Sequence, residues 1–495
     1  MPKRPSGATI PLLAGPGIAG LSLREQIYRT CLEVIVGGHL PAGARLPSAR
    51  QLASDWRVSR NTVDDAIARL QADGLVVRKV GDGTFVAPQV RAVPEPRATE
   101  RRPSKLGRAA LAGVSAAGRH ATRSYTPSSV PRAEPFLAGL PALDAFPLTL
   151  WRRLAARRWR VGGAALLGYP PSLGHLSLRH ATARHLAATR GIACTAEQVM
   201  IVNSSMQAVD LVARVLLEAT DSVLIENPCF PNLRAALAMS GARVIPVPVD
   251  TNGMRVAEGI RSAPGAALIC VSPSCQYPTG VTLSLERRLA LIDAARTIGA
   301  WIVEDDYQSE FTYEGRPLAS VHRLDHGQRT LYVGSFTNSV FPALRLAYLV
   351  LPVSLVPVFE AVRRQIDDHT HGPMQAVLAD FIDGGHFTAH LRHMRTLYHE
   401  RRDALLAACA RVLPDPLTIG PASSGMNVAL HIPIRLPDRL AVARAAAAGL
   451  KVLPLSRFAL PAERWNGLLL GYTALSERRI ADGIVRLARA LAQDR

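Results

Sequence analysis

The chain has 495 residues, of which 48% are hydrophobic, and a formal net charge of +19. This length predicts two or three domains, and the hydrophobic content excludes a chain that is disordered throughout. The sequence has no apolar run of 18 or more residues, no convincing signal peptide and no paired metal spacing among its six cysteines. We therefore expect a cytoplasmic protein with no membrane partner and no metal. The positive charge favours nucleic acid as a partner, although an arginine-rich composition could also produce it.

The first 87 residues predict a flexible end followed by a small folded unit. Residues 1–20 are rich in glycine and proline. Apolar residues at helical spacing predict a helix that ends at Gly37. Ser48 is a candidate N-cap of a short second helix, and Ser59 of a third helix over residues 60–70. Strand-like residues 75–80 and 84–87 then flank a glycine-rich turn, which predicts a hairpin.

Three helices followed by a hairpin are typical of a winged helix, here residues 21–87. The second of two close-set helices can enter the major groove with its N-terminal residues first. In this chain those residues are Arg60, Asn61 and Thr62, which can form hydrogen bonds and are not needed for the core. The pattern therefore predicts binding to double-stranded DNA.

Three strings in this unit resemble the GntR superfamily of bacterial regulators. They are Gly-x-Arg-Leu-Pro-Ser-x-Arg at residues 43–50, Ser-Arg-Asn-Thr-Val at 59–63 and Gly-x-Gly-Thr-Phe-Val at 81–86. The alternative is that the arginines are ordinary solvated surface charges. The resemblance implies a DNA-binding set made of Arg45, Ser48, Arg50, Ser59, Arg60, Asn61, Thr62 and Gly83.

Residues 88–132 predict a basic linker. Proline, alanine, serine and glycine dominate, and nine lysines or arginines face only Glu95 and Glu100. Such a segment is extended and repels itself. It could add non-specific phosphate contacts, but a solvated linker is the better interpretation.

Residues 133–495 alternate apolar runs with amphipathic helices, which predicts an α/β domain. Helices are expected between the strands, for instance over residues 206–217 and 285–297. The expected strands are residues 199–202, 222–225, 242–249, 267–271, 301–304, 330–333 and 346–351.

Several strings of this region resemble the aminotransferase-like domain of MocR-type regulators, which has the fold of fold-type I pyridoxal-phosphate enzymes. Examples are Tyr-Pro-Thr-Gly at 277–280, Glu-Asp-Asp-Tyr at 304–307 and Pro-Ala-Leu-Arg at 342–345. The resemblance implies a multidomain protein: an α+β winged helix joined to an α/β fold-type I domain with a smaller lobe at about 391–495. It also implies dimerisation and effector binding by residues 133–495, hence a homodimer with an unknown small-molecule effector.

The same resemblance implies a cofactor site for pyridoxal phosphate. Asp305 would pair with the ring nitrogen, Tyr307 would reach the ring hydroxyl, and Arg345 would hold the phosphate beside Ser204 and Ser205. Two alternatives stay open. The acidic residues 304–306 could form an ordinary turn, and Arg345 could belong to a buried ion pair.

The active-site string departs from the family at one residue. The family places the lysine that forms the Schiff base where this chain has Asn338. The nitrogen of an amide cannot condense with an aldehyde, because its lone pair is delocalised. The phosphate cup also has Ser204 where the family has glycine, and residues 467–472 contain no arginine for a substrate carboxylate. The four lysines lie elsewhere in the sequence, at Lys3, Lys79, Lys105 and Lys451.

These observations predict a DNA-binding regulator with a catalytically inactive aminotransferase-like domain. No covalent linkage to pyridoxal phosphate is expected at Asn338, and non-covalent binding stays open. The alternatives are an active pyridoxal-phosphate enzyme with a DNA-binding appendage, and a dimerisation scaffold that binds no ligand.

Overall fold

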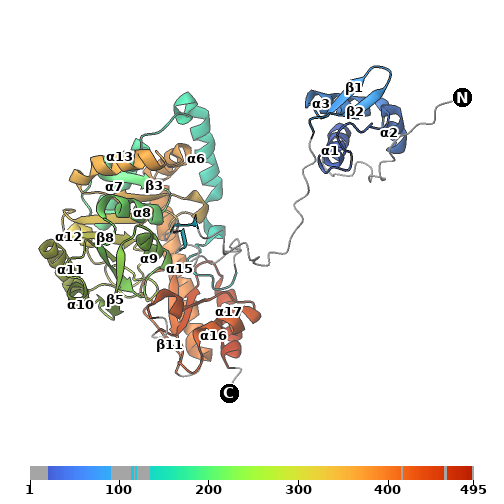
Figure 1. The fold of residues 1–495 in the computed structure, drawn as a ribbon. Coiled ribbons are helices and arrows are strands. Elements are labelled where there is room, and N and C mark those ends of the chain that lie inside the picture. The colour runs from blue at the N-terminus through green and yellow to red at the C-terminus, as the bar shows by residue number, and fades with distance from the viewer. Residues whose placement is uncertain are drawn as a thin grey trace. The chain divides into compact units, whose positions relative to one another are not determined.

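The computed structural model describes residues 21–90, 113–115, 118–119, 134–413, 416–461 and 465–492. It divides the chain into two compact units, Met1–Ala112 and Gly113–Arg495 (Figure 1). The predicted flexible end and most of the predicted linker lie outside the described residues. Within the described ranges, no helix combines the length and the apolar character that crossing a membrane requires.

The first unit is a winged helix, as predicted. Ser48 and Ser59 accept hydrogen bonds from Gln51 N–H and Thr62 N–H, so both cap the helices that they precede. The buried faces of the helices form one core that includes Ile27, Val63, Ile67 and Leu70. Its elements are α1 (Leu23–Val36), α2 (Ala49–Asp55), α3 (Arg60–Ala72) and the antiparallel strands β1 (Val76–Lys79) and β2 (Gly83–Val86).

The second unit contains an eight-stranded mixed sheet in the order β3-β10-β9-β8-β7-β4-β5-β6. The five strands from β9 to β5 are parallel to one another, whereas β10 is antiparallel to both of its neighbours and β6 to β5. The strands are β3 (Val199–Val202), β4 (Ser222–Asn227), β5 (Arg243–Asp250), β6 (Gly253–Met254), β7 (Leu268–Val271), β8 (Trp301–Asp306), β9 (Thr330–Ser335) and β10 (Ala347–Val350).

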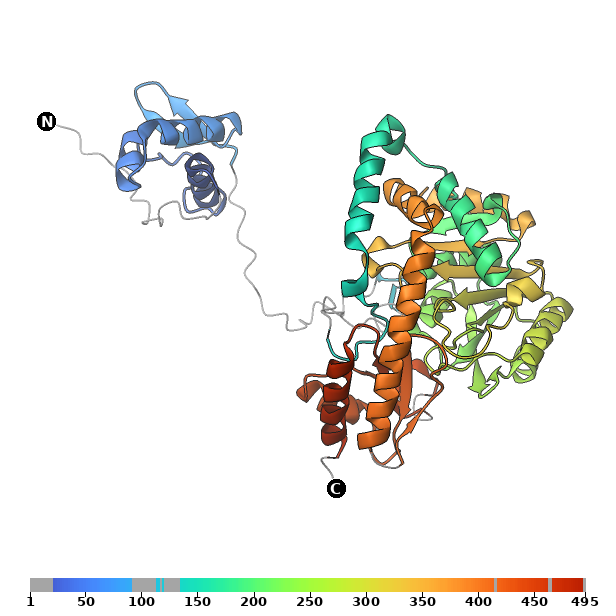
Figure 2. The ribbon, with the colours of Figure 1, turned by 180° about the vertical axis from the view of Figure 1, so that it is seen from behind.

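Successive strand residues point to opposite faces of this sheet, and helices cover both faces (Figures 1 and 2). Val223 packs in one core with residues of α8, α9 and α13, whereas its neighbour Leu224 packs in another core with residues of α10 and α11. The helices are α6 (Leu148–Val161), α7 (Leu176–Arg190), α8 (Ser205–Leu216), α9 (Pro231–Met239), α10 (Val256–Ser262), α11 (Leu285–Ile298), α12 (Val321–Leu324), α13 (Val356–Ile366) and α14 (Gly372–Asp383).

A smaller lobe follows, and α15 (His386–Val412) connects it to the large sheet domain. Figure 2 shows this helix running along both parts, and its 27 residues span about 40 Å. The lobe has a four-stranded antiparallel sheet in the order β11-β12-β14-β13. Its elements are β11 (Thr418–Ile419), β12 (Asn427–His431), α16 (Asp438–Ala447), β13 (Leu453–Pro454), β14 (Gly467–Gly471) and α17 (Glu477–Leu491).

A segment that is distant in sequence completes this lobe. Gly471 N–H donates to the carbonyl oxygen of Phe136 at 3.0 Å, and Lys451 N–H donates to that of Pro135 at 2.8 Å. The Phe136 ring is fully buried, and a Cβ at Gly483 would lie 2.5 Å from one of its atoms. Glycine at residue 483 is therefore required for this close approach.

Three strands that end at the site continue beyond their predicted bounds: β4 to Asn227 instead of residue 225, β9 to Ser335 instead of 333, and β8 to Asp306 instead of 304. We expected β8 to end at residue 304, but it continues to Asp306, which pairs with Gly334 of β9. The strand continues because its acidic side chains point alternately to the two faces of the sheet and are buried there instead of entering solvent. The alternative of an ordinary acidic turn at residues 304–306 is therefore wrong.

Candidate functional site

The first turn of α3 presents two of the three predicted recognition residues to solvent, whereas the third, Thr62, is half-buried and its hydroxyl lies 3.0 Å from that of Ser59. The Arg60 side chain is 70% exposed, and its Nε lies 3.5 Å from Asp64 Oδ2. Asn61 is also exposed, whereas Val63, Ala66 and Ile67 are buried on the opposite face. The core therefore holds the helix while its N-terminal polar side chains are available for contact.

The other predicted DNA contacts lie in the same unit. Arg45 forms an isolated bridge with Phe85 of β2, and a Cβ at Gly83 would lie 3.0 Å from Arg45 Nε. Gly83 has φ +110°, which disfavours other residues. Ser48 and Arg50 are exposed at the start of α2. The structure thus brings Arg45 directly against the wing and places Ser48 and Ser59 as helix caps.

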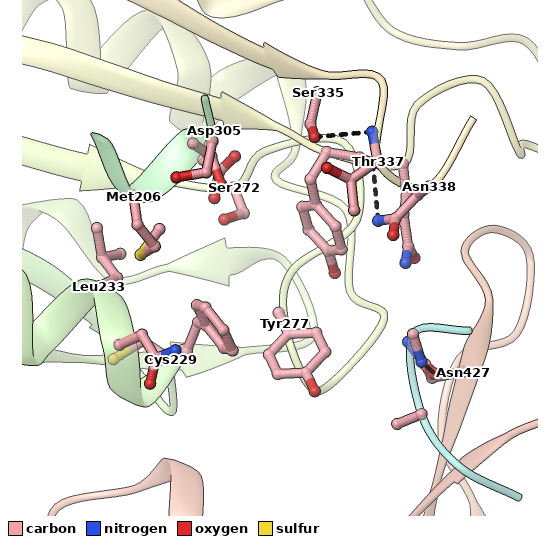
Figure 3. Close-up of a pocket in the computed structure, with 18 of the residues that line it drawn as sticks. Met206, Cys229, Leu233, Ser272, Tyr277, Asp305, Ser335, Thr337, Asn338 and Asn427 are labelled. Carbon is pink, nitrogen blue, oxygen red and sulfur yellow. Dashed lines mark hydrogen bonds between the residues drawn. The ribbon is translucent and has the colours of Figure 1, made fainter. Parts of the chain in front are cut away.

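The second unit contains a cavity of about 560 Å³ (Figure 3). It lies at the carboxyl ends of β4, β8 and β9, where open α/β sheets bind ligands. Its other walls come from α9, the smaller lobe and residues 138–139. All of the predicted cofactor residues line it: Ser204, Ser205, Asp305, Tyr307 and Arg345, together with Asn338.

Asp305 brings an unpaired acid to this cavity. Its Oδ1 is buried and has no hydrogen-bond partner in the described part of the chain. Burial raises the pKa of this carboxyl to about 7, and the charge of Asp306 adds to the effect. A buried polar atom without a partner is costly, so a ligand that donates a hydrogen bond there gains binding energy. A protonated ring nitrogen is such a donor.

A second group of residues suits an anion of the size of a phosphate. Ser204 caps α8 by accepting the Gln207 N–H at 3.1 Å, and Ser335 Oγ accepts the Thr337 N–H at 3.1 Å. Arg345 is exposed, which contradicts the alternative of a buried ion pair. A helix N-terminus, hydroxyl groups and an arginine are typical partners of phosphate.

The serine that replaces a glycine in the phosphate cup causes no backbone strain. Ser204 has φ −169°, an extended conformation that any residue adopts. With Asp305 unpaired on one side and this anion site in the same cavity, the residues present fit pyridoxal phosphate.

Asn338 lines the same cavity, and Figure 3 shows it on the opposite side from Asp305. Its Nδ2 lies 3.4 Å from the backbone oxygen of Tyr307, at the long end of the hydrogen-bond range. No lysine is among the described residues that line the cavity. An amine for covalent attachment is thus missing from these walls.

Several residues of the cavity were not among the predicted site residues. Ser335 and Thr337 belong to the polar turn that contains Asn338, so a sequence signal for them existed. Glu226 had one as well, because residues 226–228, at the end of β4, resemble the same family. Asn427 had none, because it begins the buried strand β12 and only the fold brings it to the cavity. The remaining additions include Gly139, Ser272, Phe230 and Tyr277.

The raised pKa of Asp305 predicts a pH-dependent loss of stability. Its ordinary value is 3.8 and its value in the folded chain is about 7, so between these values the folded state binds more protons than the unfolded state. Stability should therefore fall as pH rises through this window, by at most about 1.4 kcal/mol per pH unit. Denaturant unfolding at pH 5 and pH 7.5 should show a larger loss for the wild type than for Asp305→Asn. Equal losses would contradict the buried, unpaired state of this carboxyl.

Comparisons with known proteins agree with this two-part structure. The family "Bacterial regulatory proteins, gntR family" matches residues 23–86, and "Aminotransferase class I and II" matches residues 143–460. The probable rhizopine catabolism regulatory protein MocR of Rhizobium meliloti is 36% identical over 472 residues, covering 95% of this chain and 94% of that protein. The HTH-type transcriptional regulator TauR of Rhodobacter capsulatus is 32% identical, and the match covers 96% of this chain and 98% of that protein.

Solved aminotransferases share the fold of the second unit. A kynurenine aminotransferase of Pyrococcus horikoshii, in complex with PMP, superposes with a TM-score of 0.70 at 26% identity, covering 79% of this chain and 98% of its own. LysN, the α-aminoadipate aminotransferase of Thermus thermophilus, superposes with a TM-score of 0.69 at 28% identity, and the match covers 76% of this chain and 97% of LysN. With a gntR-family winged helix ahead of an aminotransferase domain, and regulators as relatives over nearly its whole length, the chain belongs to the MocR-type subfamily of GntR transcriptional regulators.

Proposed function

We propose that this regulator binds operator DNA through residues 21–87 and senses a small molecule through residues 133–495 without catalysing transamination. Residues 88–132 would serve as the linker between them. The observation that carries the proposal is Asn338 in the wall of an otherwise well-equipped cavity. An active enzyme would need an amine at this place, and a scaffold without a ligand would have no use for an unpaired buried carboxyl such as Asp305.

The cavity residues support non-covalent binding of pyridoxal phosphate or of an adduct derived from it. When bound, this group supplies an electron-withdrawing ring and an aldehyde carbon that can be joined to an amine. Asp305 would accept a hydrogen bond from the ring nitrogen, Tyr307 would reach the ring hydroxyl, and Arg345 with Ser204 and Ser205 would hold the phosphate. The Asn338 amide would donate a hydrogen bond to the ligand instead of reacting with it. A rise in melting temperature with pyridoxal phosphate would separate this function from that of a ligand-free scaffold.

The DNA-binding half of the proposal predicts the effect of one substitution. Arg60→Ala should weaken binding to a specific operator by about 1–3 kcal/mol, because Arg60 leads the recognition helix and is exposed there. Binding should be measured at fixed salt by fluorescence anisotropy.

The control is Arg29→Ala, which removes an arginine of similar chemistry from α1 of the same unit. This variant should bind as the wild type does, since an exposed ion pair contributes little. Unchanged affinity for Arg60→Ala and for Asn61→Ala would show that α3 does not read the operator.

We also propose that the protein is a homodimer that presents two winged helices. Paired half-sites should then bind more tightly than one half-site, because the second contact becomes intramolecular. Sedimentation at micromolar concentration should give the mass of a dimer. A monomer that binds one half-site as tightly as a pair would contradict this assembly.

A further inference from the structure

The described walls of the cavity provide positive charge at one place only. Among the described residues that line it, Arg345 is the single basic residue. It shares the cavity with the hydroxyls of Ser204 and Ser335 and with the N-terminus of α8, which together suit one anionic group. Once a phosphate occupies this end, no cation of the described walls is left for a second anion.

The wall toward the smaller lobe is neutral and mostly apolar. Asn427 Oδ1 accepts the Gly139 N–H at 2.9 Å, so this backbone donor is already used. Tyr277 packs edge-to-face against Phe458, with ring centroids 5.2 Å apart. Behind them lies an apolar cluster in which Leu469 of β14 packs with Phe458 and, at its edge, with Ala138 and Tyr277. A carboxylate placed against this wall would lose its hydration without gaining a cation.

The acidic side chains of the cavity provide no partner for a second anion either. Glu226 lines the cavity, and its Oε1 is buried without a partner, as is Asp305 Oδ1. The other oxygen of Glu226 accepts the Ser272 N–H at 3.0 Å. Burial raises the pKa of Asp305 to about 7 and that of Glu226 to about 8, and in either protonation state neither group supplies a positive charge for a second anion.

We infer that the cavity selects a ligand with one anionic end, of the phosphate type, and an uncharged end that carries no carboxylate. This inference rests on the proposed function and specifies its ligand. An adduct of pyridoxal phosphate with a simple amine has this character, whereas an adduct with an α-amino acid has one carboxylate too many. Substrates of ordinary transamination are thus excluded by charge in addition to the missing amine at Asn338.

One further cation lies near this wall and has to be tested. Arg457 is close enough to Tyr277 to act on its hydroxyl by charge. However, Arg457 is exposed and is not among the described residues that line the cavity. An arginine that reached in from the rim would reverse the inferred selectivity.

The test compares two stable ligands that differ by one carboxylate: N-(5′-phosphopyridoxyl)-3-methylbutylamine and N-(5′-phosphopyridoxyl)-L-leucine. Dissociation constants are measured for the full-length protein by calorimetry. The amine adduct should bind at least tenfold more tightly to the wild type. Leu469→Arg should reduce or reverse this ratio, whereas Leu469→Met and Arg457→Ala should leave it unchanged.

The comparison on the wild type decides the inference even if a variant fails to fold. Equal binding of the two adducts, or tighter binding of the leucine adduct, would overturn the selectivity while leaving the proposed sensor function intact. If Arg457→Ala removed a preference for the leucine adduct, the second cation would be identified as well. Failure of both adducts to bind would instead overturn the proposed cofactor-like site together with the inference.

Discussion

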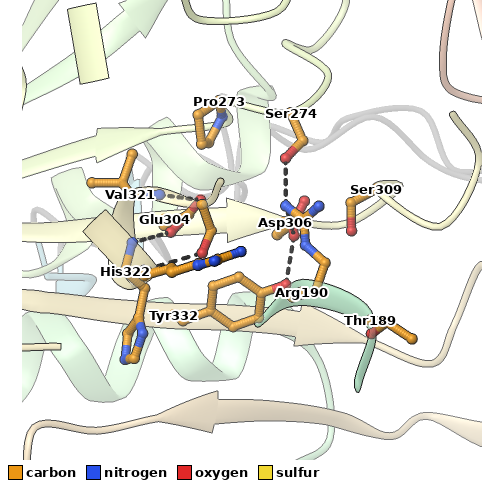
Figure 4. Close-up of polar contacts among 12 residues, drawn as sticks. Thr189, Arg190, Pro273, Ser274, Glu304, Asp306, Ser309, Val321, His322 and Tyr332 are labelled. Atoms are coloured by element: carbon orange, nitrogen blue, oxygen red, sulfur yellow. Dashed lines mark hydrogen bonds and ion pairs between the residues drawn. The ribbon is translucent and has the colours of Figure 1, made fainter. Parts of the chain in front are cut away.

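Asp306→Ala should lower the free energy of unfolding of the aminotransferase-like domain by about 3–5 kcal/mol. Asp306 Oδ2 lies 2.8 Å from Arg190 Nη2, and the two side chains are 0% and 9% exposed. Figure 4 shows this pair with Tyr332, whose hydroxyl donates to Asp306, and with Ser274, which accepts from Arg190. Burial alone would lower the pKa of Arg190, but the charge of Asp306 raises it above its ordinary value. Removal of the aspartate would therefore leave a buried guanidinium without its counter-charge.

The size of this effect is checked against an exposed pair in the same domain. Asp210 and Arg214 lie 2.7 Å apart on α8 with side chains 39% and 54% exposed, so Asp210→Ala should cost less than about 1 kcal/mol. Arg190→Met combined with Asp306→Leu should recover most of the loss, because no unpaired charge then remains. Equilibrium unfolding by denaturant measures all three. Similar losses for Asp306→Ala and Asp210→Ala would mean that solvent reaches the buried pair.

The two-domain fold could be predicted from the sequence because its signals are local. Ser48 and Ser59 stand directly before the helices that they cap, and the Gly81–Gly83 turn stands between the two strands of the wing. In the large domain, most strands appeared as continuous apolar runs. The end of β8 was misplaced because its last residues are acidic, and acidic residues normally end a strand. Only the tertiary partners of Asp306 make burial of that strand end favourable.

The candidate site could be predicted in part for the same reason. Asp305, Tyr307 and Arg345 stand inside recognisable strings, and all three line the cavity. The wall made by Asn427 and Gly139 joins residues 288 positions apart in sequence, so no local pattern reveals it. The docking of Phe136 against Gly483 is equally non-local. The neutral character of that wall, which determines the inferred ligand, became visible only with the fold.

The residue at position 338 decides whether the site can bind pyridoxal phosphate covalently, as an enzyme does, and here it is Asn338. One substitution tests whether the rest of the site can still hold this cofactor. Asn338→Lys restores an amine in the wall that faces Asp305. This amine can attack the aldehyde carbon of pyridoxal phosphate and release water, which forms a carbon–nitrogen double bond. The side chain at residue 338 is only half-buried, so the longer lysine can be accommodated.

With pyridoxal phosphate, Asn338→Lys should therefore show a new absorbance band that the wild type lacks. Borohydride should then fix a pyridoxyl group on the peptide that contains residue 338, which mass spectrometry detects. Asn338→Gln is the matched control, since it lengthens the side chain without providing an amine, and it should remain unlabelled. A wild-type protein that is labelled in the large domain after dialysis would contradict the non-covalent site. An Asn338→Lys protein that binds no pyridoxal phosphate would show that the cavity does not hold this cofactor, because Asp305, Tyr307 and Arg345 are unchanged in that variant.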